Sequence, residues 1–242
     1  MCHPDQMQPA GQLLGRRFDL ALQLASALHK TQLRKGTTVP YLAHLLSVCA
    51  LVVENGGDED QAVAALLHDA VEDQGGIPTL TMIERLFGPR VSAIVRDCSD
   101  SESADPAHKR PWKDRKQAYL DHLEQASAET LLISAADKLH NARDILTCYR
   151  QTGDELWRRF NPNATKADHL WYYRELARRL QARPEAPKLL VDELDRVVTE
   201  LEALGRIERG DGRRGDAHRT AKNSRVSSRQ EWSDEGASGL RE

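Results

Sequence analysis

The sequence has few aromatic residues, few cysteines and no long apolar run. Only 5% of its 242 residues are aromatic, and its four cysteines are scattered without a Cys-x-x-Cys pair, which argues against a disulfide framework or a cysteine-rich metal site. No stretch approaches the roughly 18 apolar residues of a membrane-spanning helix. The first residues also lack the basic flank and apolar run of a secretory signal. We therefore expect a cytoplasmic globular protein with no membrane segment.

Charge of one sign is not in excess either. The chain has 34 basic and 37 acidic side chains and a formal net charge of −3. A protein that coats nucleic acid by releasing counterions needs a basic surface, so no stable nucleic-acid complex is expected. Hydrophobic residues make up 40% of the chain, which is enough for the core of one large domain or two small ones. No pattern in the sequence indicates how many chains assemble.

The apolar residues recur with a helical period, and no alternating strand pattern is found. This predicts an all-α fold, with a single compact multi-helix domain over residues 17–205 that follows a flexible N-terminus, residues 1–16. Residues 206–242 are rich in Arg, Gly, Ser, Asp and Glu, a composition typical of a disordered tail. Polar residues 99–111 predict an exposed loop. The expected helices cover about residues 20–28, 41–54, 58–74, 79–87, 91–98, 112–125, 128–150, 154–160, 166–181 and 187–204.

The segment 64–73, AALLHDAVED, places polar groups within an otherwise apolar helix. The pairs His68/Glu72 and Asp69/Asp73 are each four residues apart, so on a helix all four side chains share one face. Titratable groups beside a core are costly unless a cation or other partners compensate them. The alternative is a solvated helix end with His68 near its cap.

Two further residues complete a possible ligand set. His44 lies among apolar neighbours, where a lone histidine is more commonly a hydrogen-bonded core residue. Asp137 follows the apolar or small run 131–136, and a carboxylate in that place requires a cation or a cluster of donors. Lys138 is a poor partner for Asp137, because adjacent helical residues point about 100° apart. With His68 and Asp69 they make an N,N,O,O set that suits Mn²⁺, Fe²⁺ or Zn²⁺.

The helix around Asp137 offers more polar groups. Asn141 and Asp144 follow it by four and seven residues and therefore share its face. His140 is predicted to point elsewhere, and His169 has no context that would distinguish it from an ordinary histidine.

The order His44, His68-Asp69, Asp137 resembles the H…HD…D signature of HD-superfamily metal-dependent phosphohydrolases. Segments 34–44, 68–73 and 137–143 are similar to the extended motifs RK-G-PY-x-x-H, HD-x-V-E-D and D-[RK]-L-H-N-x-R. These extended forms resemble the hydrolase domain of RelA/SpoT-type proteins and the small stand-alone alarmone hydrolases. The likeness covers about residues 17–182. Arg34 precedes His44 by one residue more than is usual in the family.

The resemblance implies a pyrophosphohydrolase that removes the 3′-diphosphate from (p)ppGpp, the alarmone of the stringent response, and that usually depends on Mn²⁺. Carried over by position, the metal ligands would be His44, His68, Asp69 and Asp137. Glu72 and Asp73 would position and activate the attacking water. The substrate contacts would be Arg34, Lys35, Lys138, Asn141 and Asp144, with Arg34 over the nucleobase.

Several alternatives stay open. The chain could be an HD-superfamily nucleotidase that acts on another nucleotide, or a module that binds alarmone without cleaving it, although such a module would be expected to lack Glu72 or Asp73. The base could be guanine or adenine, because Asp144 stands where the family often has threonine. Only a tail follows the last expected helix, so we expect no synthetase activity.

Overall fold

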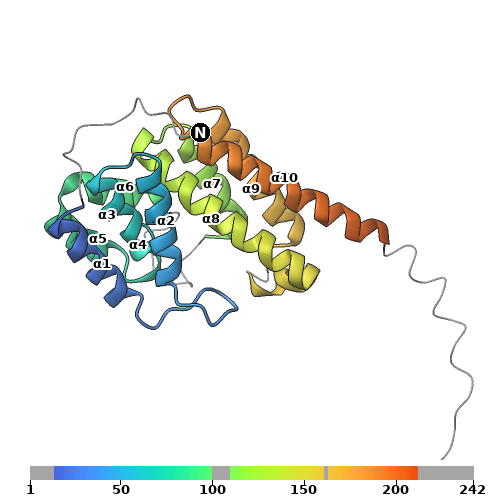
Figure 1. Ribbon diagram of the computed structural model, residues 1–242, viewed down its shortest axis with the longest axis horizontal. Coiled ribbons are helices and arrows are strands. Elements are labelled where there is room, and N and C mark those ends of the chain that lie inside the picture. The colour runs from blue at the N-terminus through green and yellow to red at the C-terminus, as the bar shows by residue number, and fades with distance from the viewer. Residues whose placement is uncertain (1–13, 100–109, 161–162, 212–242) are drawn as a thin grey trace, which may run out of the picture. The chain divides into compact units, whose positions relative to one another are not determined.

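Figure 1 shows the computed structural model of the chain, which describes residues 14–99, 110–160 and 163–211, the last five without their side chains. Every regular element in this part of the chain is a helix, so the all-α prediction is confirmed. In chain order the elements are α1 (Arg16–Leu28), α2 (Leu42–Glu54), α3 (Glu59–Leu67), α4 (Ala70–Asp73), α5 (Ile77–Phe87), α6 (Pro89–Cys98), α7 (Trp112–Leu123), α8 (Ala128–Thr152), the 3₁₀ helix η2 (Gly153–Arg159), α9 (Lys166–Gln181) and α10 (Lys188–Asp211).

The long helix α8 lies at the centre of the helical unit. It packs against α2, α3 and α6 on one side, and against η2 and α9 on the other. Thirteen of its 25 residues are buried, so it has core on more than one face. Asp137 lies near the middle of this helix, which places a carboxylate deep in the fold.

Helix ends follow local capping chemistry. Asp58 caps α3 and Thr165 caps α9, each in a reciprocal capping box with the residue three positions later. The Ser127 side chain accepts a hydrogen bond from the amide of Thr130 at the start of α8. These caps fix where the helices that border the site begin.

Several boundaries shift by two to four residues, as for α1, which begins at Arg16 and not at about residue 20, and three differences from the sequence prediction matter for the argument. The helix expected over 58–74 breaks after Leu67 and resumes at Ala70, so His68 and Asp69 form a turn between α3 and α4. Thr79, the first residue of the helix expected over 79–87, lies inside α5, which begins at Ile77, and its hydroxyl donates to the Gln74 carbonyl at 2.8 Å.

The third difference concerns the last helix and the ends of the chain. The chain divides into two units, Met1–Ala203 and Leu204–Glu242, and α10 continues to Asp211, seven residues beyond its expected end. Most of the predicted N-terminus 1–16, of the loop 99–111 and of the tail 206–242 falls outside the described residues, so their disorder and exposure stay predictions. Within the described residues, no helix combines the length and hydropathy required to cross a bilayer.

Candidate active site

The structure brings the four predicted metal ligands together from three parts of the chain. His44 comes from α2, His68 and Asp69 from the turn between α3 and α4, and Asp137 from α8. Both histidines are almost fully buried. His44 Nε2 lies 3.2 Å from Asp137 Oδ1 and 3.6 Å from Asp69 Oδ2. His68 Nε2 lies 3.0 Å from Asp69 Oδ2 and 3.7 Å from Asp137 Oδ1.

This geometry fits one divalent cation. Ligand atoms about 2.1 Å from a common ion, at octahedral or tetrahedral angles, are separated by roughly 3.0–3.4 Å, close to the distances observed. The buried Nε2 atoms of His44 and His68 have no hydrogen-bond partner in the described part of the chain. The Ala65 carbonyl can only accept, so His68 Nδ1, 2.8 Å away, carries its hydrogen. When His68 is deprotonated, as it must be to bind a metal, its lone pair is therefore on Nε2, directed at the cluster.

The electrostatics of the cluster favour a cation as well. Burial opposes the charge on His68, but the carboxylates of Asp69 and Asp137 raise its pKa well above its usual value. Burial likewise opposes ionisation of Asp137, yet the neighbouring Lys138 ammonium, followed by His44 and His68, brings its pKa well below its usual range. The two carboxylates are thus held as anions in a buried place that attracts positive charge.

Lys138 is a partner of Asp137 after all. Its ammonium donates to Asp137 Oδ2, which contradicts the expectation that adjacent helical residues point too far apart. The flexible four-carbon stem of lysine lets the charged end fold back toward the neighbouring side chain. Asn141 Nδ2 donates to Asp137 Oδ1 at 2.5 Å, as its place on the same helix face led us to expect. Tyr41 Oη donates to Asp69 Oδ2, also at 2.5 Å.

His140, which the helical period predicts to point away from the ligands, contacts His44 in the structure. Its Nδ1 lies 2.8 Å from His44 Nδ1, and the two ring centroids are 4.8 Å apart. Burial, followed by His44 and Arg34, lowers the pKa of His140 to about 4, so the ring is neutral near pH 7 and one of its nitrogens can accept a hydrogen bond. The position of His140 within the D-K-L-H-N motif was the signal in the sequence for a role at the site. Helical periodicity could not relate it to His44, because His44 lies on another helix.

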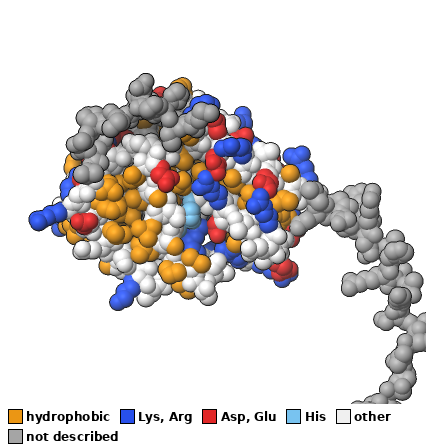
Figure 2. Space-filling model, in the orientation of Figure 1, with side chains coloured by type: hydrophobic (Ala, Val, Ile, Leu, Met, Phe, Trp, Pro, Cys, Tyr) orange, Lys and Arg blue, Asp and Glu red, His pale blue; other side chains and the backbone are white. Residues whose placement is uncertain are grey.

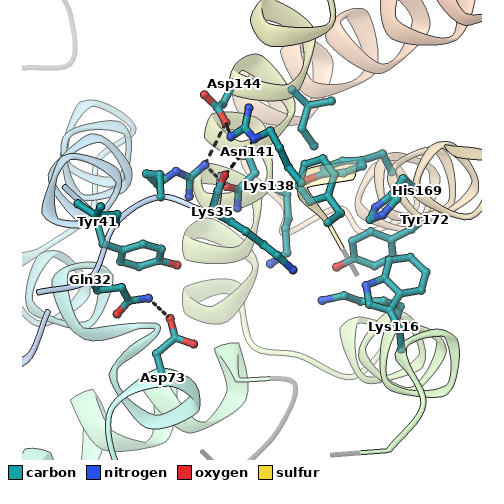
Figure 3. A pocket seen from close by; sticks show the side chains of 17 residues that line it. Gln32, Lys35, Tyr41, Asp73, Lys116, Lys138, Asn141, Asp144, His169 and Tyr172 are labelled. Atoms are coloured by element: carbon teal, nitrogen blue, oxygen red, sulfur yellow. Dashed lines mark hydrogen bonds and ion pairs between the residues drawn. The ribbon is translucent and has the colours of Figure 1, made fainter. Parts of the chain in front are cut away.

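Beside the cluster lies a cavity of about 370 Å³. Tyr41, Lys138 and Asn141 line it and also contact cluster carboxylates, so the cluster and the cavity share a wall. Lys35, Lys138 and Lys116 extend toward its middle from the loop 29–41, α8 and α7 (Figure 3). Such a cavity can take an anion with several negative charges. On the face of the molecule that Figure 2 shows, a histidine ring is visible in a hollow, with Lys and Arg side chains nearby.

The candidate base residues lie on the short helix α4, directly after the ligand pair. Asp69 is the N-cap of α4, and its carbonyl accepts a hydrogen bond from the Asp73 amide at 3.0 Å, so Asp69 and Asp73 keep the expected four-residue relation although the helix expected over 58–74 is broken after Leu67. Asp73 lines the cavity, where Gln32 Nε2 donates to its Oδ2 at 2.8 Å. Glu72 Oε1 lies 3.8 Å from a guanidinium nitrogen of Arg115.

The predicted substrate contacts surround the same cavity. Arg34 NH2 donates to Asn141 Oδ1 at 2.8 Å and lies 3.5 Å from Asp144 Oδ2. All five predicted contacts, Arg34, Lys35, Lys138, Asn141 and Asp144, are among its lining residues.

The sequence did not indicate the rest of the cavity lining. It consists of residues from α7, η2 and α9 and includes Trp112, Lys116, Arg159, His169 and Tyr172. His169 is 6% exposed and stacks on Trp157 with ring centroids 5.5 Å apart. The aromatic residues of this segment were the available signal, but nothing in the sequence related them to the ligand motifs.

Comparison with known proteins identifies relatives by a family model, by sequence and by structure. A family model described as "HD domain" matches residues 21–181. The chain is 37% identical over 131 residues to the guanosine-3′,5′-bis(diphosphate) 3′-pyrophosphohydrolase MESH1 of Xenopus tropicalis, over 53% of this chain and 69% of the relative. The Drosophila melanogaster MESH1 is 34% identical over 132 residues, with the same two coverages. A solved structure described as a metazoan ortholog of SpoT that hydrolyzes ppGpp matches with a TM-score of 0.61 and 26% identity, over 77% of this chain and 97% of that one.

Proposed function

This chain belongs to the HD domain family and is a phosphohydrolase of the alarmone hydrolase type, and from this premise we propose that it removes the 3′-diphosphate of ppGpp. The products are GDP and pyrophosphate. The observation that carries the proposal is the shared wall between the buried His/Asp cluster and a lysine-lined cavity. We further propose Mn²⁺ as the metal and the cytoplasm as the location of the enzyme.

The metal would be held by His44, His68, Asp69 and Asp137. The donor atoms of the first three lie within 4.8 Å of one another, and Asp137 Oδ1 lies 3.2 Å from His44 Nε2 and 3.7 Å from His68 Nε2. When bound, a divalent cation supplies Lewis acidity toward water and toward the phosphoryl oxygens. This set of two imidazoles and two carboxylates suits Mn²⁺, Fe²⁺ or Zn²⁺.

The proposed reaction breaks the bond between phosphorus and the ribose O3′. Water attacks that phosphorus, and Glu72 accepts the proton that the water loses. The ribose O3′ leaves and takes up a proton, which balances the one that Glu72 received and returns Glu72 to its carboxylate form, while pyrophosphate departs with the transferred oxygen. Asp73, held by Gln32, positions the water.

Basic residues around the cavity would bind and orient the rest of the substrate. Lys35 and Lys138 offer ammonium groups to the phosphates, since charge stabilisation and alignment carry most of phosphoryl-transfer catalysis. Asn141 bridges Arg34 and Asp137, so it connects the nucleoside side of the cavity to the cluster. Arg34 and Asp144 would lie nearest the base.

The decisive experiment measures release of pyrophosphate from ppGpp by the purified full chain with and without Mn²⁺. ppApp, GTP and a deoxynucleoside triphosphate form the comparison panel. H68A should lose both bound metal and activity, because His68 is a buried ligand. H122A is the matched control, because His122 is an exposed histidine on α7.

Hydrolysis of ppGpp far above the rest of the panel supports the proposal. Faster hydrolysis of ppApp than of ppGpp would mean that the enzyme prefers adenine to guanine as the nucleobase. Faster hydrolysis of a triphosphate would favour the nucleotidase alternative. A H68A variant that retains stoichiometric metal and full turnover would contradict the assigned metal centre.

A further inference from the structure

Arg159, at the end of η2, connects three separate segments beside the cavity. Its Nε donates to the backbone carbonyl of Lys35 at 3.0 Å, across 124 positions of sequence. Its NH2 lies 3.6 Å from Asp144 Oδ2 on α8. The side chain is only 18% exposed, so an arginine on one segment is enclosed by contacts with the other two.

The loop that Arg159 contacts carries two of the proposed substrate-binding residues. Residues 29–41 connect α1 to α2, and backbone hydrogen bonds close the loop on itself, from the Arg34 amide to the Val39 carbonyl at 2.8 Å and from the Tyr41 amide to the Gln32 carbonyl at 2.9 Å. These bonds fix the shape of the loop but not its place against the rest of the molecule. Contacts with other segments supply that, from Gln32 to Asp73 and from Tyr41 to Asp69 at the two ends of the loop, and from Arg159 to the backbone at Lys35 in its middle.

Gly36 shows how closely Arg159 packs on this loop. Gly36 has φ +69°, and a Cβ built at this position would lie 2.6 Å from Arg159 Cγ. A side chain at Gly36 would therefore meet both an unfavourable backbone conformation and a steric clash. The stem of Arg159 lies directly against the loop backbone, one residue from Lys35.

The charge arrangement extends the same contact to Arg34. The guanidinium groups of Arg34 and Arg159 lie 3.5 and 3.6 Å from the same Asp144 oxygen, so one carboxylate attracts both. Arg34 also donates to Asn141. The contacts of Arg159 thus reach the Lys35 backbone directly and the Arg34 head group through Asp144.

We propose that Arg159 is a positioning residue that holds Arg34 and Lys35 in their binding orientation in the cavity. This inference rests on the proposed function for its kinetic consequence. A loop that is already ordered binds substrate without an ordering cost at the moment of binding. Arg159 makes no contact with His44, His68, Asp69, Asp137 or Glu72 among the interactions described, so its removal acts on binding and not on the chemical step.

The first test compares R159A with R158A in the full chain. Arg158 is the adjacent arginine of η2, 80% exposed and paired only locally with Glu155 among its described contacts, so it controls for loss of charge. R159A should raise the KM for ppGpp by about tenfold and leave kcat within about a factor of two, whereas R158A should change neither. R159K should give a smaller rise, since lysine keeps the charge beside Asp144 but lacks the planar fork. If R159A does not fold, R159K is the variant whose KM and kcat are compared with those of R158A.

The second test separates positioning from direct substrate contact. If Arg159 acts through the loop, R159A should raise KM by a smaller factor in a K35A background than in the wild type, because interacting sites are not additive. A full additional factor in that background would mean that Arg159 contacts substrate itself, and would overturn the inference.

A third readout does not depend on activity. Hydrogen exchange of the peptide covering 30–41 should accelerate in R159A and not in R158A. Unchanged exchange, or a fall in kcat at unchanged KM, would contradict the inference. If the wild type does not hydrolyse ppGpp, the proposed function fails, while the exchange measurement still decides whether Arg159 holds the loop.

Discussion

The Nδ1 atoms of His44 and His140 lie 2.8 Å apart, so one ring donates a hydrogen bond to the other. If His44 binds metal through Nε2, its Nδ1 must carry the hydrogen, and His140 Nδ1 is then the acceptor. The lowered pKa of His140, about 4, keeps that acceptor available at neutral pH. His140 therefore fixes the tautomer and the ring orientation of a proposed metal ligand.

Replacing His140 should weaken metal binding without removing a ligand. We expect H140A to lower the affinity for Mn²⁺ by roughly 10–100-fold, the usual effect of losing a group that orients a ligating histidine. Chelator competition on the purified protein measures this, with H122A as the surface control. An unchanged affinity in a folded H140A would show that packing alone orients His44.

The Glu72 carboxylate is predicted to act in the chemical step. E72Q keeps the shape of the side chain but cannot accept a proton, so kcat should fall by roughly 10²–10⁴ while metal content and KM change little. Glu84 is an exposed glutamate on α5, and E84Q is the matched control. Turnover within a few-fold of wild type in E72Q would transfer the role of base to Asp73.

Stability should fall on acidification because of His169. Burial, followed by the Lys116 and Lys35 ammonium groups, lowers its pKa to about 4. Between about pH 6.5 and 4 the unfolded chain binds a proton at this residue and the folded chain does not, so this site lowers the free energy of unfolding by up to about 1.4 kcal/mol per pH unit as the pH falls. H169F keeps a ring against Trp157 but cannot titrate.

Urea denaturation of the wild type and H169F at pH 7 and pH 5 measures this contribution. Between pH 7 and pH 5, the free energy of unfolding should decrease less in H169F than in the wild type. The difference between the two decreases is the contribution of His169. Parallel decreases in the two proteins would mean that His169 titrates normally in the fold.

The residues after α10 are predicted to be dispensable for chemistry. Residues 212–242 contain seven basic and five acidic side chains, which nearly cancel, so they should exert little long-range attraction on a nucleotide. Truncation after Asp211 should leave Tm and kcat/KM close to those of the full chain. A tenfold loss, about 1.4 kcal/mol of transition-state stabilisation, would show instead that the segment contributes to the site.

The sequence predicted the helices well where an amphipathic period and a cap coincide, as in α9, whose bounds match the expected 166–181. It failed at His68-Asp69, since a run of good helix formers gives no local sign of a break. In the structure these two residues are held by contacts that a single segment cannot reveal, with Tyr41 from the preceding loop and with carboxylates and imidazoles from α2 and α8.

The candidate site was predictable to the extent that its residues lie in motifs. Spacing indicated the ligand set and the shared face of Asp137 and Asn141, and the structure brings these groups together. Spacing could not indicate Lys138 as the partner of Asp137, because the direction in which a residue leaves the helix does not determine where the end of a long flexible side chain lies. The roles proposed for Arg159 and His140 could not be predicted from the sequence for another reason. Each acts through a contact with a residue that is distant in the sequence.

The rigidity of α8 has a consequence for how the length of this chain can vary. Asp137 and Asp144 lie seven residues apart on one uninterrupted helix, about 10.5 Å along its axis. A single inserted residue between them would turn Asp144 by about 100° and remove it from the cavity wall, so insertions and deletions should be excluded from this stretch. The loop 29–41 can absorb a change in length, and the family resemblance implies one additional residue between Arg34 and His44. In related chains, length variation should therefore accumulate before His44 and stop at α8.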